Sequence, residues 1–175
     1  ALAGVVCGRE DLIKQVYHYR EINGATLDPM SAYFILRGMK TLALRIERQN
    51  QNALEIARYL ESHQQIQKVF YPGLESHEGH TIAKKQMSGT GGLFSVYLKA
   101  ENIEQVEEFF HRLQRFLLAV SWGGHESLVL PSAAFYGILG KEDSPIPWNL
   151  VRFAIGLEEV EYVWEDLEQA LSVFG

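Results

Sequence analysis

Residues 93–98 read LFSVYL, and they alternate in polarity as a half-buried β-strand does. Phe94, Val96 and Leu98 would share one face and the residues between them the other, since successive side chains of a strand point to opposite sides. A strand with two unlike faces is typical of an antiparallel sheet that is covered on one face only.

Further short strands and helices are expected on both sides of this stretch. Apolar runs bounded by turn residues predict strands, and apolar residues at helical spacing predict helices. The resulting order, strand–helix–strand–helix–strand–strand–helix, indicates an α/β fold with a small, largely antiparallel sheet and helices on one face. The expected elements are strands at 66–71, 93–98, 116–121 and 150–156 and helices at 80–87, 103–113 and 159–174, with a loop-rich stretch at 131–148.

The first third of the chain is mostly helical by the same criteria. Apolar residues recur at helical spacing in 9–22, and Asp28-Pro29 is a start signal for a second helix, since Asp caps helices and Pro suits their first turn. A third pattern over 41–63 predicts a helix of roughly 30 Å, a length that often joins two lobes. Residues 1–8, ALAGVVCG, read as a strand buried on both faces. Such a strand cannot stand alone, so we expect this chain to be part of a longer polypeptide.

Composition excludes several classes of protein. Of the 175 residues 47% are hydrophobic, and the 9 Phe, 8 Tyr and 3 Trp rule out a disordered chain. The net charge of -6 argues against a nucleic-acid partner, which would favour clustered Lys and Arg. No apolar run approaches the ~20 residues of a membrane helix, and no signal peptide is visible. We therefore expect a cytoplasmic protein with no membrane partner.

The single cysteine and the histidines suggest no metal or disulfide chemistry. Cys7 has no partner in the chain, so a disulfide scaffold is excluded, and it reads as a small core residue. His77 and His80 are three residues apart with His63 upstream, but zinc would need further ligands at suitable spacing. No metal site is expected.

Arg152 is the most informative single residue. It lies in LVRFAIG (150–156), with the apolar Val151 and Phe153 on either side. A guanidinium in mid-strand must find a partner, because an unpaired buried charge costs several kcal/mol. Two interpretations stay open: an internal ion pair or a solvated outer face, or a fork that binds a carboxylate in bidentate fashion, for which Arg suits better than Lys.

A glycine-rich stretch, Ser121-Trp122-Gly123-Gly124, follows a predicted strand. Two glycines in sequence most often make a tight turn. They also let the backbone come close to a ligand, and in that case Ser121 would offer a hydroxyl and Trp122 a flat apolar wall.

Five stretches of the chain are specific enough to identify a family. They are LAGVVCGREDLI (2–13), GATLDPMSAYFILRGMKTLALRIERQNQNALEIARYLE (24–61), VFYPGLESHEGHTIAKKQMSGTGGLFSVYL (69–98), AVSWGGHESL (119–128) and LVRFAIGLEEVEYVWEDLEQAL (150–171). In this order they resemble the Cys/Met-metabolism family of pyridoxal-phosphate enzymes, which contains cystathionine γ-synthase, cystathionine β-lyase, cystathionine γ-lyase and methionine γ-lyase. The resemblance implies the carboxyl-terminal part of a fold-type-I, aminotransferase-like subunit.

The resemblance also implies a domain organisation and a cofactor. Residues 1–37 would end the large cofactor-binding domain, 38–63 would form a long interdomain helix, and 64–175 would form the small carboxyl-terminal domain. The lysine that holds pyridoxal 5'-phosphate as a Schiff base is expected upstream of Ala1. This chain alone would then bind no cofactor covalently and be inactive, with no cofactor-binding residue assigned in it. The full-length protein would be a homo-oligomer, a dimer of dimers.

Four residues are expected at the substrate by this resemblance. Arg152 resembles the arginine that binds the substrate α-carboxylate, so that the Cα–H bond stands over the cofactor ring. Ser121 resembles the serine beside the catalytic lysine. Trp122 belongs to the SWGG form typical of β-lyase-like members, and Val120 is similar to methionine γ-lyases, where γ-synthases usually carry Glu.

Val120 and Trp122 favour a carbon–sulfur lyase that acts on cystathionine, methionine or a related amino acid by β- or γ-elimination. The alternatives are a γ-synthase that performs γ-replacement and, from a different class, a non-catalytic binding or assembly module. Residues 127–150 depart from the family's pattern. That loop borders the substrate tail, so the identity of the substrate stays open.

Overall fold

The computed structural model describes residues 2–136 and 144–175. By its contacts the chain divides into two compact units, Ala1–Ala43 and Leu44–Gly175. The boundary falls within the first turn of the long helix α3 (Leu42–Ser62). In the described residues the first unit is helical, and the second contains a β-sheet with helices.

The first unit contains two helices with well-formed ends. The first, α1 (Glu10–Asn23), ends at Gly24, whose φ of 69° lies in the left-handed region that glycine adopts without strain. The second, α2 (Pro29–Met39), begins where Asp28 accepts a hydrogen bond of 2.9 Å from the backbone N–H of Ser31. Both helices confirm the prediction from spacing and caps.

The strand expected over residues 1–8 is wrong in the described part of that stretch. Residues 2–8 form no strand, and all are exposed. An apolar run becomes a strand only where another strand offers hydrogen-bond partners. The described residues of the first unit contain none, so the run remains unpaired. Cys7 is accordingly exposed rather than a core residue.

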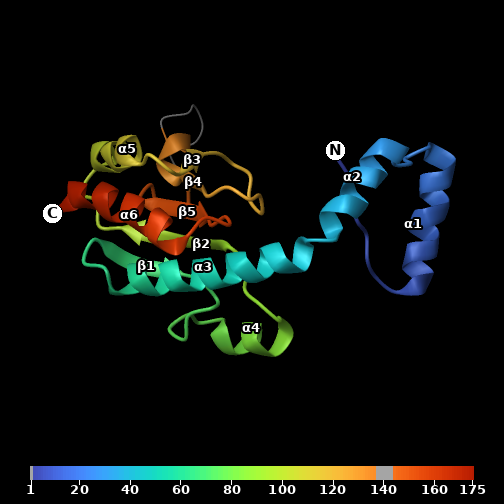
Figure 1. Cartoon of the computed structure of the whole chain (residues 1–175), viewed down its shortest axis with the longest axis horizontal. Helices are drawn as coiled ribbons and strands as arrows, with labels where there is room; N and C mark the ends of the chain where they lie inside the picture. Colours follow the sequence, from blue (N-terminus) through green and yellow to red (C-terminus); the bar gives the residue numbers. More distant parts are fainter. Residues whose placement is uncertain (1, 137–143) are drawn as a thin grey trace. The chain divides into compact units, whose positions relative to one another are not determined.

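The second unit is built on a mostly antiparallel sheet of five strands in the order β1-β2-β5-β4-β3 (Figure 1). Only the pair β3 and β4 is parallel. The strands are β1 (Ile66–Phe70), β2 (Leu93–Leu98), β3 (Leu117–Leu118), β4 (Leu128–Pro131) and β5 (Leu150–Ala154). The helices of this unit are α3, α4 (His80–Gln86), α5 (Ile103–Arg112) and α6 (Val160–Leu171), with short 3-10 turns at Ser132–Phe135 and Ser172–Phe174.

One face of the sheet carries the hydrophobic core. Phe94, Val96 and Leu98 of β2 are buried as the alternation predicted, and Phe153 of β5 packs against Phe94 with ring centroids 5.5 Å apart. Helices α3, α5 and α6 supply the other half of this core. They lie around the strands in Figure 1, and α3 runs the length of the sheet. The core residues from the helices are Ala53, Ile56, Ala57, Leu60, Val106, Phe109, Val163, Leu167, Ala170 and Leu171. The prediction of helices on one face is confirmed.

Two strand predictions need correction. The strand expected at 116–121 contains only the two-residue β3, and β4 lies partly where a loop was expected. Leu128 and Val129 are adjacent in β4 and point to opposite faces of the sheet, yet both are buried, and a strand buried on both faces shows no alternation. Part of the expected loop, residues 137–143, lies outside the described residues.

Candidate functional site

Arg152 lies in the middle of β5, on the sheet face away from the core. Its neighbours in sequence, Val151 and Phe153, are buried, so the alternation of the strand turns the guanidinium to the opposite face. There it is flanked across the strands by Ser95 of β2 and Leu130 of β4. The side chain is half-buried, so it is neither a core group nor a fully solvated one.

Backbone carbonyls hold the guanidinium in place. The Nη2 group of Arg152 donates to the carbonyl oxygens of Val120 at 2.7 Å and Ser121 at 3.1 Å, with that of Ala119 at 3.5 Å. These carbonyls belong to the chain that continues β3, beyond β4 from Arg152. The strand order β5-β4-β3 therefore brings Arg152 to a segment more than 30 positions earlier in the chain.

Arg152 forms no ion pair with a described acid and uses only part of its hydrogen-bond donors. The Nε atom is buried without a hydrogen-bond partner, and no acid of the described residues forms an ion pair with the guanidinium. A guanidinium has five N–H donors, and in this part of the chain only Nη2 donates. Of the two interpretations that the sequence left open, the described residues provide no internal ion pair. The second interpretation, a carboxylate fork, has donors available.

The Ser121–Gly124 loop contacts Arg152 in a way that the sequence did not indicate. Ser121 binds it through its backbone carbonyl and not through the hydroxyl. Trp122 places its ring 5.5 Å from the guanidinium carbon, a cation–π contact, while 64% of the residue stays exposed. Val120 is also exposed, at 63%. Gly123 has a φ of 78°, which explains why a glycine follows the tryptophan.

Buried polar side chains of α3 hold this loop and the loop that follows β5, and the sequence did not single them out. Gln49 is 3% exposed and donates through Nε2 to the carbonyl of Gly124 at 2.6 Å. Asn52 is 1% exposed and donates through Nδ2 to the carbonyls of Gly156 and Glu158, at 3.2 and 2.8 Å. A signal was present: the two side chains are three residues apart in a helix whose other buried positions are apolar, so they share its buried face.

The three histidines have separate partners. His63 Nε2 lies 3.4 Å from Glu168 Oε2. The Nδ1 atom of His80 is hydrogen-bonded to the carbonyl of Pro72, and that of His77 accepts the backbone N–H of Gly79. Within the described residues no three His, Cys, Asp or Glu side chains gather as metal ligands would.

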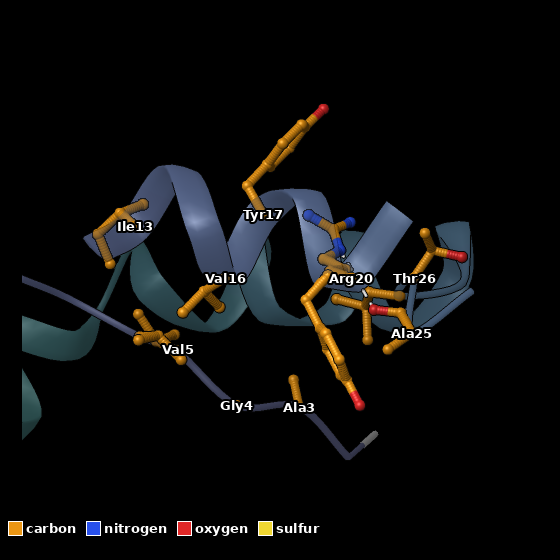
Figure 2. Close-up of a pocket in the computed structure, with 12 residues that line it drawn as sticks. Ala3, Gly4, Val5, Ile13, Val16, Tyr17, Arg20, Ala25 and Thr26 are labelled. Atoms are coloured by element: carbon orange, nitrogen blue, oxygen red, sulfur yellow. Dashed lines mark hydrogen bonds between the residues drawn. The ribbon is translucent and has the colours of Figure 1, made fainter. Parts of the chain in front are cut away.

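The first unit has a hollow of its own, with a volume of about 750 Å³ (Figure 2). Apolar side chains such as Val5, Ile13 and Val16 line most of it. Its one cation, Arg20, donates to the carbonyl of Ala25 at 3.2 Å. None of the residues predicted at the substrate lines this hollow, and it offers no set of groups for acid–base or nucleophilic chemistry.

The described residues form a mixed α/β domain in which Arg152 lies on the sheet face away from the core and is held there by backbone carbonyls. Such a group is suited to a small carboxylate. The model of the family described as "Cys/Met metabolism PLP-dependent enzyme" matches residues 1–172. The chain belongs to this family, whose members include lyases and synthases, and forms the carboxyl-terminal part of its fold-type-I architecture.

Several curated relatives are similar over 98% of the chain. They are cystathionine gamma-synthase 1, chloroplastic, of Arabidopsis thaliana, at 42% identity, L-methionine gamma-lyase of Fusobacterium nucleatum subsp. polymorphum, at 40%, and cystathionine beta-lyase of Lactococcus lactis subsp. cremoris, at 40%. The chain spans 31%, 45% and 46% of the length of these relatives. None of the helices in residues 2–136 and 144–175 has the length and apolar character to cross a membrane.

Among the described residues, the partners of Arg152 include no amine that could hold pyridoxal phosphate. Pyridoxal phosphate is bound through a lysine amine. No lysine is among the hydrogen-bond or ring partners of Arg152 and Trp122 in the described chain. Those partners are backbone carbonyls and an indole ring, and neither can form a Schiff base with the cofactor.

Proposed function

We propose that this chain supplies the substrate-binding part of a pyridoxal-phosphate-dependent carbon–sulfur lyase. The substrates would be cystathionine, methionine or a related sulfur amino acid, cleaved by β- or γ-elimination. Relatives named beta-lyase and gamma-lyase support the reaction class. Trp122 and Val120 favour a lyase over a synthase, because by resemblance lyases carry these residue types at these positions.

Arg152 would bind the substrate's α-carboxylate. The observation that carries this role is that backbone carbonyls, and no described acid, hold the guanidinium through Nη2 alone, so no described carboxylate competes with a ligand for its remaining donors. Charge-assisted, bidentate bonds to a carboxylate are stronger than neutral ones. They would fix the orientation of the amino acid, which is the contribution of binding to catalysis here. Trp122 beside the guanidinium and exposed Val120 would border the rest of the substrate, with Ser121 fixing the arginine.

The test of this role is substitution of Arg152 in the full-length protein. Arg152→Ala removes a charged hydrogen-bond pair worth about 1.5–3 kcal/mol per bond, so kcat/KM for cystathionine or methionine should fall by about 100-fold or more. Arg152→Lys keeps the charge but not the fork and should fall in between. An unchanged kcat/KM in Arg152→Ala refutes the assignment.

A γ-synthase is the second candidate, and a specific finding favours it: cystathionine gamma-synthase 1 of Arabidopsis thaliana is 42% identical. The two reactions differ in product. A lyase releases an α-keto acid from cystathionine or methionine, whereas a synthase forms cystathionine from cysteine and an activated homoserine. Measuring both products with one preparation of the full-length protein decides between them. A non-catalytic binding or assembly module would form neither.

The remaining parts of the proposal concern the whole protein. Residues 1–37, 38–63 and 64–175 would be the end of the large domain, the interdomain helix and the small domain, and the protein would work as a homotetramer in the cytoplasm. Two plant relatives are named as chloroplastic, so a fluorescent fusion is the test of location. The chain alone would bind no pyridoxal phosphate covalently. An aldimine absorbance band that borohydride removes would contradict that.

A further inference from the structure

Three loops meet at the end of the sheet where α3 presents its polar side chains. Residues 89–92 lead into β2, 121–127 lead into β4, and 155–159 follow β5. Strands β2 and β4 are each antiparallel to β5, so the first residues of β2 and β4 and the last residues of β5 lie at the same end of the sheet. Arg152, in β5, and the carbonyls that hold it belong to the same region.

Each of these loops is tied to α3 by a side-chain amide. Gln49 bonds the carbonyl of Gly124, Asn52 bonds the carbonyl of Gly156, and Asn50 accepts the backbone N–H of Gly91. A buried amide costs free energy unless it is hydrogen-bonded, so these side chains are stable beneath the loops because they bond the loop backbone. Here they fix the backbones of the three loops.

The loops are also joined to one another, which makes the assembly stiff. The Leu157 N–H donates to the carbonyl of His125 at 2.8 Å, and Ser127 donates twice to the Glu158 carboxylate, at 2.7 and 2.9 Å. Gly156 approaches so closely that an added Cβ would lie 2.3 Å from the His125 carbonyl oxygen. Loops packed this tightly leave little room for alternative arrangements.

The Gln49 bond reaches the loop nearest to Arg152. Gly124 lies three residues after Ser121, whose carbonyl binds Nη2, and two after Trp122, whose ring covers the guanidinium. The loop is thus held at its start by Arg152, in its middle by Gln49 and at its end by the Glu158 carboxylate, which accepts from Ser127. With the middle bond removed, the carbonyls of residues 119–121 would no longer be fixed relative to α3.

We infer that Gln49 is a positioning residue, which acts through Gly124 to hold the carbonyls that aim the Arg152 guanidinium. The consequence for the carboxylate rests on the proposed function, whereas the effect on the loop does not. Gln49 touches no substrate in this arrangement, because its amide is buried beneath the loop. Its loss should loosen the site while the core of the sheet stays folded.

The test compares Gln49→Met with Gln169→Met in the 175-residue chain. Gln169 is the control: its Nε2 also donates to a backbone carbonyl at 2.6 Å, that of Arg112, and its hydrogen-bond partners lie in α5 and α6, but its side chain is exposed. Gln49→Met loses the bond to the Gly124 carbonyl, and Gln169→Met loses its bonds to Arg112 and Asp166. Thermal unfolding by circular dichroism measures the loss of stability in each variant, so that their exchange rates are compared after correction for global stability.

Amide hydrogen exchange gives the readout without ligand. The N–H groups of Ala119 and Leu157 are both bonded across the loop, to Val129 and His125. In Gln49→Met their exchange should quicken by about tenfold relative to Gln169→Met, the effect of one lost hydrogen bond. Equal exchange in the two variants overturns the inference, because the change would then reflect global stability alone.

A ligand titration separates this inference from the proposed function. L-methionine, with L-methioninol as the analogue without a carboxylate, is added while the NMR signals of the Arg152 Nε–H and the Trp122 indole N–H are followed. A shift with methionine but not with methioninol supports the carboxylate role. In that case Gln49→Met should weaken the binding of methionine about five- to tenfold. If the unsubstituted chain responds equally to both compounds, the carboxylate role fails, and the exchange result still decides whether Gln49 positions the loop.

Discussion

The two units of the chain form helices equally well but differ in what they bury. In the first unit neither α1 nor α2 has a buried residue, and most of their large apolar side chains are exposed. In the second unit, α3, α5 and α6 cover one face of the sheet with a continuous core. Caps and spacing therefore determine where a helix forms, whereas burial against a second layer determines how stable it is.

Hydrogen exchange on the intact chain tests most directly whether the two units differ in stability. Amides of β2 and β5 should open only with the whole second unit, at a cost of 5 kcal/mol or more for a typical domain, whereas α1 should open locally. The expected difference is about a thousandfold or more in exchange rate. Slow exchange in α1, matching that of β2, would show that the first unit is stabilised as strongly as the second.

Truncation of one phenylalanine in each unit measures how much buried packing contributes to the stability of that unit. Phe109 of α5 is fully buried and packs on Phe110 and Phe174, so Phe109→Ala should cost about 3–5 kcal/mol of unfolding free energy. Phe34 of α2 is 52% exposed, and Phe34→Ala should cost well under about 1 kcal/mol. Urea unfolding of both variants gives the two values. Equal losses would contradict the difference between the units.

A buried carboxylate in the second unit gives a smaller effect. Asp166 is 2% exposed and accepts the backbone N–H groups of Gln114, Arg115 and Phe116, at 2.9, 2.8 and 3.3 Å. Asp166→Ala leaves these donors without an acceptor and should cost about 2–3 kcal/mol in urea unfolding. Asp166→Asn retains one acceptor oxygen and should lose less. If Asp166→Asn loses more unfolding free energy than Asp166→Ala, the hydrogen bonds to the backbone are not the source of the stability.

The sequence predicted those elements whose signals are local. Asp28-Pro29 marked the start of α2, and the alternation of 93–98 marked β2. The strand expected at residues 1–8 failed because pairing depends on a second strand, which no local pattern reveals. Strand β4 was missed for a related reason: Leu128 on one face and Val129 on the other are both buried by packing, which removes the alternation.

In the candidate site too, the sequence predicted what depends on local signals and missed what depends on the pairing of distant segments. Arg152 stood out in the sequence because a charge interrupts an apolar strand. Its partners, the carbonyls of Val120 and Ser121, depend on the strand order β5-β4-β3, which the sequence does not encode locally. Gln49 and Asn52 were missed because a polar residue in a helix is usually a solvated one, although their spacing puts them on the same face as the buried apolar residues of α3.

The smallest expected effect is a pH dependence confined to the first unit. The hydrogen bond with Ser31 lowers the pKa of Asp28 below its usual value of 3.8. A carboxyl whose pKa is lower in the folded state stabilises α2 above the unfolded pKa, and this contribution disappears as the pH falls through the folded pKa. Acidification below about pH 4 should therefore reduce the helical circular dichroism of α2, and Asp28→Ala should abolish that part of the change. Because Asp28 is exposed, the change should leave the tertiary signals of the second unit unaltered. A simultaneous loss of both signals would mean that the two units unfold as one.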